Sequence, residues 1–298
     1  EYINKNKYPK IVVMTQTRVK EFKNLNIFLS INDIFSIWPN NLKFIINTQQ
    51  KSITNTHQEI IHHNYLEYQS PFLPLSQARN NLLKISLKYF QDFDYFIHID
   101  DDAYIYDYSL LIQSLLYLKR QNLNCLIIGS VCNPSLDPIS KHIKNLKTFK
   151  RFNIFNHNAI MGSCICYGKD LIKKNISFDN NFGLGSNYGG SEETELFFKA
   201  IEENIPIIYN PCFIVVHPPH FKNQYNFKKM FKYGFGRGAV YKKFLNINIY
   251  IMFLFLIVGI IFNLIYFIIG IICINRSFAL RNLGLMLGKI YGFIRYQD

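Results

Sequence analysis

Three consecutive carboxylates, Asp100, Asp101 and Asp102, end an apolar run that begins at Tyr95. The chain has only 20 Asp and Glu residues against 33 Lys and Arg, so a cluster of acids is unusual within it. Adjacent carboxylates repel each other, and a divalent cation offsets that repulsion. Mg²⁺ and Mn²⁺ prefer oxygen ligands and often share them with the phosphates of a substrate. The triplet therefore predicts one half of a metal–phosphate site, with a solvated turn capped by acids as the alternative.

A second acidic group begins the helix predicted over residues 191–204, after the Gly-Gly of NYGGSEETELFFKA. Its first turn holds Glu192 and Glu193, and the helix dipole favours their ionised forms. An ionised carboxylate near a metal–phosphate site is a candidate general base, although acids also favour helix N-termini without any catalytic role. Glu195 is expected to face solvent or to pair with Lys199.

Two further side chains complete the set of candidates. Arg79, followed by Asn80, opens a predicted helix ahead of the acidic triplet. His217 ends an apolar strand just before Pro-Pro. A neutral imidazole there can complete the shell of a metal ion, and a hydrogen-bonded structural histidine is the alternative. His98, inside the strand that leads to the triplet, is expected to be structural.

The segments that must position these side chains alternate between strand and helix. Ligands of open α/β sheets bind at the carboxyl ends of strands, which is where the triplet and His217 are expected. The alternation is typical of an α/β fold with a largely parallel sheet. Buried-strand patterns cover residues 10–15, 42–48, 94–100, 124–131 and 205–210, and helical periodicity covers 75–90, 109–120 and 191–204.

Residues 249–274 form a charge-free apolar segment in which Asn263 is the only strongly polar residue. A helix of this length would extend about 39 Å, enough to cross a bilayer with some tilt. The segment therefore predicts a transmembrane helix, with a buried core helix as the alternative. Lysines precede the segment and arginines follow it, so the positive-inside rule does not decide which end of the helix faces the cytoplasm.

Residues 275–298 carry apolar side chains at helical spacing, with cations between them. This pattern predicts an amphipathic helix at the membrane surface, and a second, shorter segment that dips into the membrane is the alternative. The apolar positions are Leu280, Leu283, Leu287, Ile290 and Ile294.

The formal net charge of +13 predicts a polyanionic partner. Anionic lipid and a phosphorylated substrate fit this charge better than nucleic acid, because no aromatic-basic recognition module is present. The six cysteines include no C-x-x-C pair, which argues against zinc. Free thiols in a reducing compartment are the simplest interpretation.

Taken in order, these motifs resemble those of family 2 glycosyltransferases of the membrane-anchored kind that builds surface polysaccharides. SQARN and IHIDDDAYI are similar to that family's A-R-N helix and D-x-D strand. ISFDNNFG, GGSEETELFFKA and IPIIYNPCFIVVH resemble its F-D-x-x-F element, acidic pair and V-x-H strand, and FKYGFGRGAVYKKF is also similar. The resemblance covers most of the chain and implies the GT-A fold, a Rossmann-like, mixed but mostly parallel sheet with flanking helices.

The resemblance implies an inverting, metal-dependent transfer of a sugar from a nucleotide-sugar donor to a hydroxyl of a glycan or lipid-linked acceptor. Glu193 would deprotonate the acceptor hydroxyl and Glu192 would hold the acceptor, with the choice of base between them open. Mn²⁺ or Mg²⁺ would be bound by Asp102, His217 and Asp100. The donor would be bound by Thr15, Thr17, Arg18, Arg79, Asp100, Asp101 and Arg237.

Some positions depart from the family pattern. TQTRV replaces the usual tyrosine-asparagine turn, NTQQ lacks an aspartate for the base, and Glu193 stands where Asp is usual. A preference for uridine is therefore not implied. Two other functions stay open. One is a nucleotidyltransferase, against which the absence of glycine from MTQTRVKEFKNL counts, and the other is a non-catalytic membrane-anchored protein that binds sugar nucleotides or glycans.

We therefore expect a catalytic domain over residues 1–220, a basic juxtamembrane segment over 221–248, a transmembrane helix over 249–274 and an amphipathic tail over 275–298. Nucleotide sugars are made in the cytosol. The catalytic domain is accordingly expected on the cytoplasmic side of a bacterial-type inner membrane, held by a single-pass C-terminal anchor.

Overall fold

The computed structural model describes residues 8–18, 41–50, 58–61, 65–174, 176–218 and 226–297. The chain divides into two compact units. Unit 1 comprises residues 1–73, 77–177 and 199–219, and unit 2 comprises residues 74–76, 178–198 and 220–298. The boundary expected at residue 220 lies outside the described residues.

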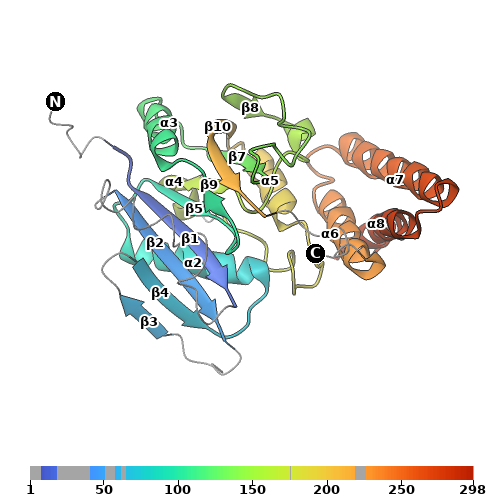
Figure 1. Ribbon diagram of the computed structural model, residues 1–298, viewed down its shortest axis with the longest axis horizontal. Coiled ribbons are helices and arrows are strands. Elements are labelled where there is room, and N and C mark those ends of the chain that lie inside the picture. The colour runs from blue at the N-terminus through green and yellow to red at the C-terminus, as the bar shows by residue number, and fades with distance from the viewer. Residues whose placement is uncertain are drawn as a thin grey trace. The chain divides into compact units, whose positions relative to one another are not determined.

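Unit 1 is built on a ten-stranded mixed sheet (Figure 1). The order across it is β3-β4-β2-β1-β5-β9-β7-β10-β6, with β8 paired to β10. β1 pairs in parallel with β2 and β5, β2 with β4, and β7 with β10, so the predicted α/β fold with a mostly parallel central sheet is confirmed. The strands are β1 (Ile11–Thr17), β2 (Leu42–Gln49), β3 (Gln58–Ile61), β4 (Tyr65–Ser70), β5 (Tyr95–His98), β6 (Tyr104–Ile105), β7 (Leu126–Cys132), β8 (Lys150–Phe152), β9 (Ile165–Gly168) and β10 (Ile207–Val216).

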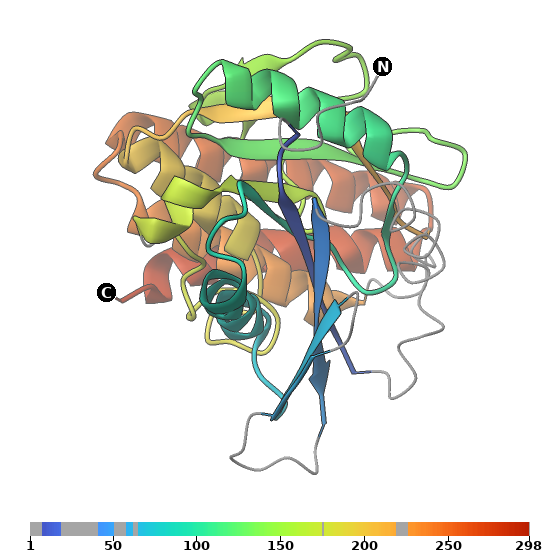
Figure 2. The same cartoon turned by 90° about the vertical axis from the view of Figure 1, so that its left-hand side faces the viewer.

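The central strands β1, β5 and β7 are almost entirely buried, which explains why they read as continuous apolar runs rather than alternating ones. The sheet is strongly twisted. Figure 2 shows the blue strands at one end running across the direction of the green strand β7. In the described part of the chain up to residue 202, the helices are α2 (Leu75–Tyr89), α3 (Tyr108–Arg120), α4 (Lys169–Lys173) and α5 (Glu192–Glu202), together with the 3₁₀ turn Ile154–Asn156.

Most predicted elements lie within three residues of the observed ones. The largest difference is the strand predicted over 205–210, which continues as β10 to Val216. Its pairing with β7 shifts register between Tyr209 and Ile214, a stretch that contains Pro211. Proline has no N–H to donate, so an irregularity there keeps the strand paired on both sides. The extension brings the end of β10 directly to His217.

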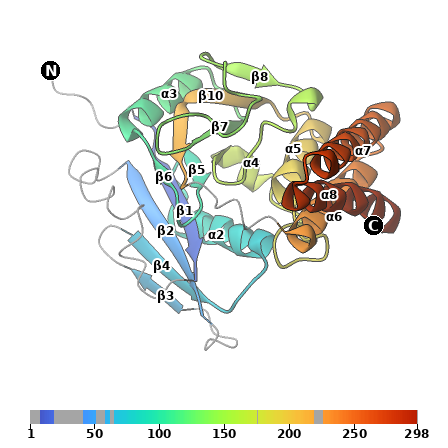
Figure 3. The same cartoon turned by 45° about the vertical axis from the view of Figure 1, so that its right-hand side comes forward.

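Three long helices, α6 (Phe227–Lys243), α7 (Ile249–Ile272) and α8 (Arg276–Arg295), belong to unit 2 and lie side by side (Figure 3). Each begins after an asparagine whose side chain accepts a hydrogen bond from the backbone N–H three residues on. These N-caps are Asn226, Asn248 and Asn275. Asparagine is among the best N-caps, so the local sequence explains where all three helices start.

Helices α6 and α8 approach each other closely at glycines, and the ring of Tyr291 on α8 also contacts the rings of Phe231 and Phe235 on α6. A Cβ on Gly288 would lie 2.2 Å from the carbonyl oxygen of Phe231, and one on Gly238 would lie 2.0 Å from that of Lys289. A Cβ on Gly292 would lie 2.0 Å from the carbonyl oxygen of Phe235, and one on Gly284 would lie 2.7 Å from that of Phe227. The four-residue spacing of these glycines gives each helix a face on which the other's backbone can rest.

The apolar residues predicted for the tail helix do not lie on the glycine face of α8. Leu280, Leu287, Ile290 and Ile294 are exposed, while Ala279 and the glycines are buried. Within the described residues, α7 is the one helix that is long and apolar enough to span a membrane, and most of its surface is exposed. The structure thus contains the predicted membrane-span candidate, over Ile249–Ile272.

None of the six cysteines, all of which lie in the described part of the chain, forms a disulfide. Four are buried, Cys212 is partly exposed and Cys273 is exposed at the end of α7. Burial raises the pKa of the Cys164 and Cys125 thiols to about 12, so these groups are unreactive at neutral pH.

Candidate active site

The carboxyl end of β5 and the end of β10 meet because the short strand β6 joins them. After the triplet, the chain turns back and pairs antiparallel with β10, with Tyr104 opposite Val216. This register places Asp102 beside His217, 115 positions later in the chain. Nε2 of His217 lies 3.1 Å from Oδ1 of Asp102 and 4.0 Å from Oδ2 of Asp100. The structure therefore brings the three predicted metal ligands together in unit 1.

The ring of His217 is held in one orientation. Its Nδ1 lies 2.7 Å from the carbonyl oxygen of Pro218, and its backbone N–H donates to the carbonyl oxygen of Cys132 at 2.9 Å. Because a carbonyl only accepts, Nδ1 must carry a hydrogen, and Nε2 faces the carboxylates. The hydrogen bond with Asp102 raises the pKa of His217 to about 9, although burial of the ring opposes this.

Arg79 anchors the first acid of the triplet. Its Nη2 lies 3.1 Å from Oδ1 of Asp100, and its side chain is only 4% exposed. The guanidinium rests on Gly162, where a Cβ would lie 3.0 Å from both terminal nitrogens. Burial, and then the charge of Arg79, hold the pKa of His98 well below its usual value, so this histidine is neutral and fits the structural role expected for it.

The middle acid of the triplet faces another neighbour. Asp101 makes a side-chain hydrogen bond with Thr17, the last residue of β1, and burial raises its pKa. Thr15 and Thr17 are both buried, and the hydroxyl of Thr15 has no hydrogen-bond partner among the described residues. Arg18 is exposed, with its Nε 3.5 Å from Oε1 of Gln49 and its guanidinium 4.8 Å from the ring of Phe72.

The residues around His217 fit a hard divalent cation. Adjacent ligands of an octahedral ion at about 2.1 Å lie about 3.0 Å apart, close to the 3.1 Å between Asp102 and His217. Two acceptors this close need a proton or a cation between them, and because Nδ1 donates to Pro218, Nε2 is the nitrogen that would bind a metal in place of its proton. Among the described residues, no three His, Cys, Asp or Glu side chains form a complete metal site by themselves.

The second acidic group lies in unit 2, at the start of α5. Glu192 is buried, and Glu193 beside it is partly exposed. Ser191 before them has a φ of +65° and Gly183 a φ of +99°; a Cβ on Gly183 would be 3.4 Å from Oε2 of Glu192. The positive φ at Ser191, where glycine would be the usual residue, identifies this turn as a constrained one.

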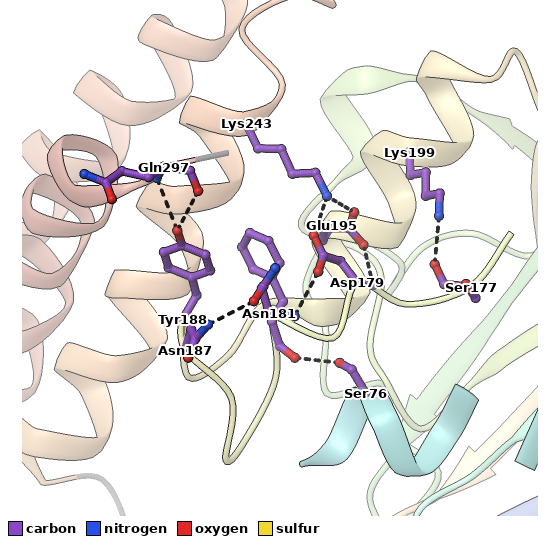
Figure 4. Close-up of polar contacts among 11 residues, drawn as sticks. Ser76, Ser177, Asp179, Asn181, Asn187, Tyr188, Glu195, Lys199, Lys243 and Gln297 are labelled. Carbon is purple, nitrogen blue, oxygen red and sulfur yellow. Dashed lines mark hydrogen bonds and ion pairs between the residues drawn. The ribbon is translucent and has the colours of Figure 1, made fainter. Parts of the chain in front are cut away.

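The expectation for Glu195 is wrong. Its side chain is fully buried, and its Oε1 accepts from Nζ of Lys243 at 2.6 Å (Figure 4). Lys243 also donates to Oδ2 of Asp179 at 2.7 Å, and the backbone N–H of Asp179 donates to Oε2 of Glu195 at 3.3 Å. Lys199 instead donates to the carbonyl oxygen of Ser177. Glu195 and Lys199 are four residues apart on one helix, which suggested that they pair. The side of α5 that carries Glu195 is buried, however, and there Lys243 of α6 is its partner.

Asp179 and Lys243 are therefore partners of Glu195 that the sequence did not single out. Asp179 belongs to the FDNNF motif, which was the available signal, while Lys243 looked like one of several juxtamembrane cations. Near them, Ser76 donates to the carbonyl oxygen of Phe182 at 2.6 Å, and Tyr188 bonds to the backbone of Gln297 (Figure 4). The first bond ties the loop before α5 to the start of α2, and the second ties it to the residue after the end of α8, all within unit 2.

Arg237, the remaining predicted donor contact, lies on α6 in unit 2. It makes a side-chain hydrogen bond with Tyr241, one turn further along the same helix. The residues gathered in one place in unit 1 are thus Arg79, Asp100, Asp102 and His217, with Asp101 bonded to Thr17, whereas Glu192, Glu193 and Arg237 belong to unit 2.

No protein-family model and no curated protein matches the chain. Solved structures do. S. aureus TarS, residues 1–349, is 12% identical with a TM-score of 0.50, and its complex with UDP is 13% identical with a TM-score of 0.52; each match covers 80% of this chain and 71% of that one. The mannosyltransferase PcManGT from Pyrobaculum calidifontis, in complex with GDP-Man and Mn²⁺, is 10% identical with a TM-score of 0.53, over 95% of this chain and 87% of that one.

At such low identity the likeness concerns the fold and not the substrate. The matches extend over most of the chain, and the proteins matched are glycosyltransferases. The mixed, mostly parallel sheet and its flanking helices therefore have the fold of glycosyltransferases.

Proposed function

We propose that this protein is a membrane-associated, inverting glycosyltransferase that moves a sugar from a nucleotide-sugar donor to a hydroxyl of a glycan or lipid-linked acceptor. The observation that carries the proposal is the pairing of Asp102 with His217, next to Asp100 and Arg79, at the carboxyl edge of a sheet with a glycosyltransferase fold. Ligands bind at that edge in α/β sheets. The solved complexes with UDP and with GDP-Man support a nucleotide-sugar donor.

In this proposal Asp102 and His217, with Asp100, hold Mn²⁺ or Mg²⁺, and the Mn²⁺ in the PcManGT complex supports this choice. The cation would supply Lewis-acid neutralisation of the diphosphate that leaves with the nucleotide. Arg79, fixed against Gly162, keeps the Asp100 carboxylate oriented and adds positive charge beside the donor phosphates.

Further donor contacts are proposed on the residues that the sequence singled out. Thr15, Thr17 and Arg18, at the end of β1, line the nucleotide side of the site, and Asp101 supports them through its bond to Thr17. Arg237, on α6, stays a proposed donor contact that would offset diphosphate charge as the leaving group forms. Glycine is absent from MTQTRVKEFKNL, which disfavours a nucleotidyltransferase.

Glu193 acts as the general base and removes the proton of the acceptor hydroxyl as that oxygen bonds to the anomeric carbon, opposite the departing nucleotide. The partial exposure of Glu193 lets an acceptor reach it, and the burial of Glu192 suits a residue that holds the acceptor or shapes the turn. A single displacement of this kind inverts the anomeric centre. Glu193 is longer than the aspartate usual here, so its backbone must lie farther from the sugar.

The test uses the full-length protein in membranes, a panel of nucleotide sugars and Mn²⁺, with donor hydrolysis and transfer as readouts. We expect turnover of at least one donor, and a loss of about 100-fold or more in Glu193→Gln, as for removal of a general base. Glu203→Gln, an exposed acid after the same helix, is the matched control and should retain activity.

Other results would overturn the proposal. Donor binding without turnover would indicate the non-catalytic binding protein, and release of diphosphate from a nucleoside triphosphate would indicate a nucleotidyltransferase. Full activity in Glu193→Gln with loss in Glu192→Gln would exchange the roles of the two glutamates.

A further inference from the structure

Helices α7 and α8 run antiparallel and stay in contact along their whole length. Near the turn between them, a Cβ on Gly270 would lie 2.7 Å from the backbone nitrogen of Ala279. Half-way along, Nζ of Lys289 donates to the carbonyl oxygen of Gly259 at 3.1 Å. At the far end, the rings of Phe253 and Phe293 are 5.3 Å apart. Two helices in contact at three such levels share nearly one axis direction, so a membrane that α7 crosses must also be crossed by α8.

Helix α6 extends this constraint. Gly284 of α8 approaches Phe227, Gly288 approaches Phe231, and Gly292 approaches Phe235, so α6 lies parallel to α8 at backbone contact distance. α6 carries six cations in 17 residues, at Lys228, Lys229, Lys232, Arg237, Lys242 and Lys243. A helix with this charge does not enter the hydrocarbon of a bilayer. Because α6 lies parallel to α8, α8 could cross the bilayer only if α6 entered it too. The packing of α6 therefore argues against a membrane-crossing orientation of α8 and of α7.

Lys289 gives an independent argument. Its ammonium group bonds to Gly259, which lies ten residues after the start of the 24-residue α7. If α7 crossed the membrane, this cation would be close to the bilayer centre, where ionised side chains are rare and costly. If α7 instead lies along the membrane, Lys289 sits on the side of α7 that faces α8 and away from the lipid.

We propose that α7 and α8 lie in the plane of the membrane and enter one leaflet, instead of crossing the bilayer. The inference rests on the membrane association in the proposed function, but not on the reaction. The occupant of the exposed face is a bilayer surface that contains anionic lipid, because the apolar face adjoins the cations of α6 and the chain carries a net charge of +13.

The exposed residues fit this orientation. On α7 they include Phe253, Ile257, Ile261 and Ile268, while Met252, Leu256, Asn263 and Gly270 are buried on the opposite side. A helix is about 10–12 Å across, and one leaflet offers about 15 Å of hydrocarbon, so α7 can be immersed without reaching the other side. Leu287, Ile290 and Ile294 of α8 continue the lipid-facing surface.

The test asks on which side of the membrane the turn between α7 and α8 lies. Single cysteines are introduced in full-length protein that lacks the two accessible native ones, Cys212→Ser and Cys273→Ser. Ser277→Cys reports on the exposed turn, and Lys141→Cys, in an exposed loop, reports on unit 1. Sealed inverted vesicles from the bacterial host are treated with a membrane-impermeant thiol reagent, before and after detergent. The four buried cysteines stay unlabelled in the folded protein.

We expect both cysteines to be labelled without detergent, since both ends of α7 then lie on the side of unit 1. Labelling of Ser277→Cys only after detergent, with Lys141→Cys labelled before it, would show that α7 crosses and would overturn the inference. Arg276→Cys repeats the test if Ser277→Cys does not fold. Failure of the protein to sediment with membranes would overturn the proposed membrane association itself, which is a separate outcome.

Discussion

The three neighbouring aspartates have three different partners. Asp100 pairs with Arg79, Asp101 bonds to Thr17, and Asp102 is next to His217. This division follows from the turn after β5, which points consecutive side chains in different directions. Asp102 is the aspartate in closest contact with His217. Its side chain is 53% exposed, against 34% for that of Asp100. It is therefore the acid best placed to take a ligand from solution.

The first prediction separates Asp102 from its neighbour. In the metal-dependent mechanism proposed above, Asp102→Asn should lower kcat/KM by about 100-fold or more, because it removes a charged metal ligand. Asp101→Asn can keep the bond to Thr17 and should lose less than about tenfold. Steady-state kinetics across a range of Mn²⁺ concentrations checks both, and a chelator should abolish the wild-type activity reversibly. Equal losses in the two variants would contradict the assignment.

The second prediction concerns the buried charges of unit 2. Lys243→Met leaves the fully buried Glu195 without its cation. We expect a loss of roughly 2–4 kcal/mol in the free energy of unfolding, less than for a fully buried pair because the lysine is partly exposed. The double variant Glu195→Gln/Lys243→Met should lose less than the sum of the two single variants. Thermal or denaturant unfolding in detergent measures these losses.

Lys242→Met is the matched control for Lys243→Met. Lys242 is the preceding residue of α6 and is exposed, with its Nζ 5.5 Å from the ring of Phe293. Its removal should cost at most about 1 kcal/mol. If both variants lose the same stability, the Lys243–Glu195–Asp179 contacts do not stabilise unit 2 as argued.

Among the helices, the close contact of α6 with α8 depends on glycines, which have no Cβ to keep the backbones apart. Both helices place glycines at four-residue spacing, so the backbones meet without intervening side chains. The apolar residues of α8 are then free to face away from α6. The helix uses its glycines for contact with α6, and Leu280 and Leu287 stay exposed, as an amphipathic helix at a membrane surface requires.

The third prediction tests this packing. Gly288→Ala would place a Cβ 2.2 Å from the carbonyl oxygen of Phe231 and 3.0 Å from Cα of Gly234, atoms that move only with the helix. We expect a loss of about 1–3 kcal/mol, as for an overpacked core. In the control Gly259→Ala, the nearest atom is Nζ of Lys289, which can move aside, so the loss should be small. Melting temperatures of purified protein in detergent distinguish the two, and an unchanged Gly288→Ala would contradict the packing.

At the scale of the whole molecule, the units do not follow the order of the sequence. Residues 178–198, which carry Glu192 and Glu193, belong to the same compact unit as the C-terminal helices. The sequence analysis instead assigned these residues to a catalytic domain over residues 1–220, separate from the C-terminal helices. The loop before α5 is tied to α6 by the ion pair of Asp179 with Lys243, and to Gln297 just after α8 by Tyr188.

The fourth prediction follows from that organisation. A chain that ends at residue 248 loses α7 and α8 and exposes the glycine face of α6. We expect it to lose glycosyl transfer, because the turn that holds Glu193 loses its support, while unit 1 keeps measurable affinity for the nucleotide through Arg79 and the aspartates. Calorimetry with the nucleotide product and a transfer assay measure the two properties separately. A truncated chain with full transfer activity would contradict the prediction.

Apolar periodicity is a local property of the chain, and it was enough to predict five of the ten strands and the helices α2, α3, α5, α7 and α8. It also placed Asp100–Asp102 at the end of a strand, since that strand is an unbroken apolar run. From this the α/β fold and the edge of the sheet that carries the candidate site could be predicted.

Contacts between residues that are distant in the chain could not be predicted from local patterns. Asp102 meets His217 through the register of β6 on β10, a pairing that a two-residue strand hardly signals in the sequence. Glu195 looked like a surface acid because a buried carboxylate and an exposed one read alike until the partner, Lys243, is in place. The glycine face of α8 carries no hydropathy signal, and close backbone contact is a property of two helices together, which no single segment encodes.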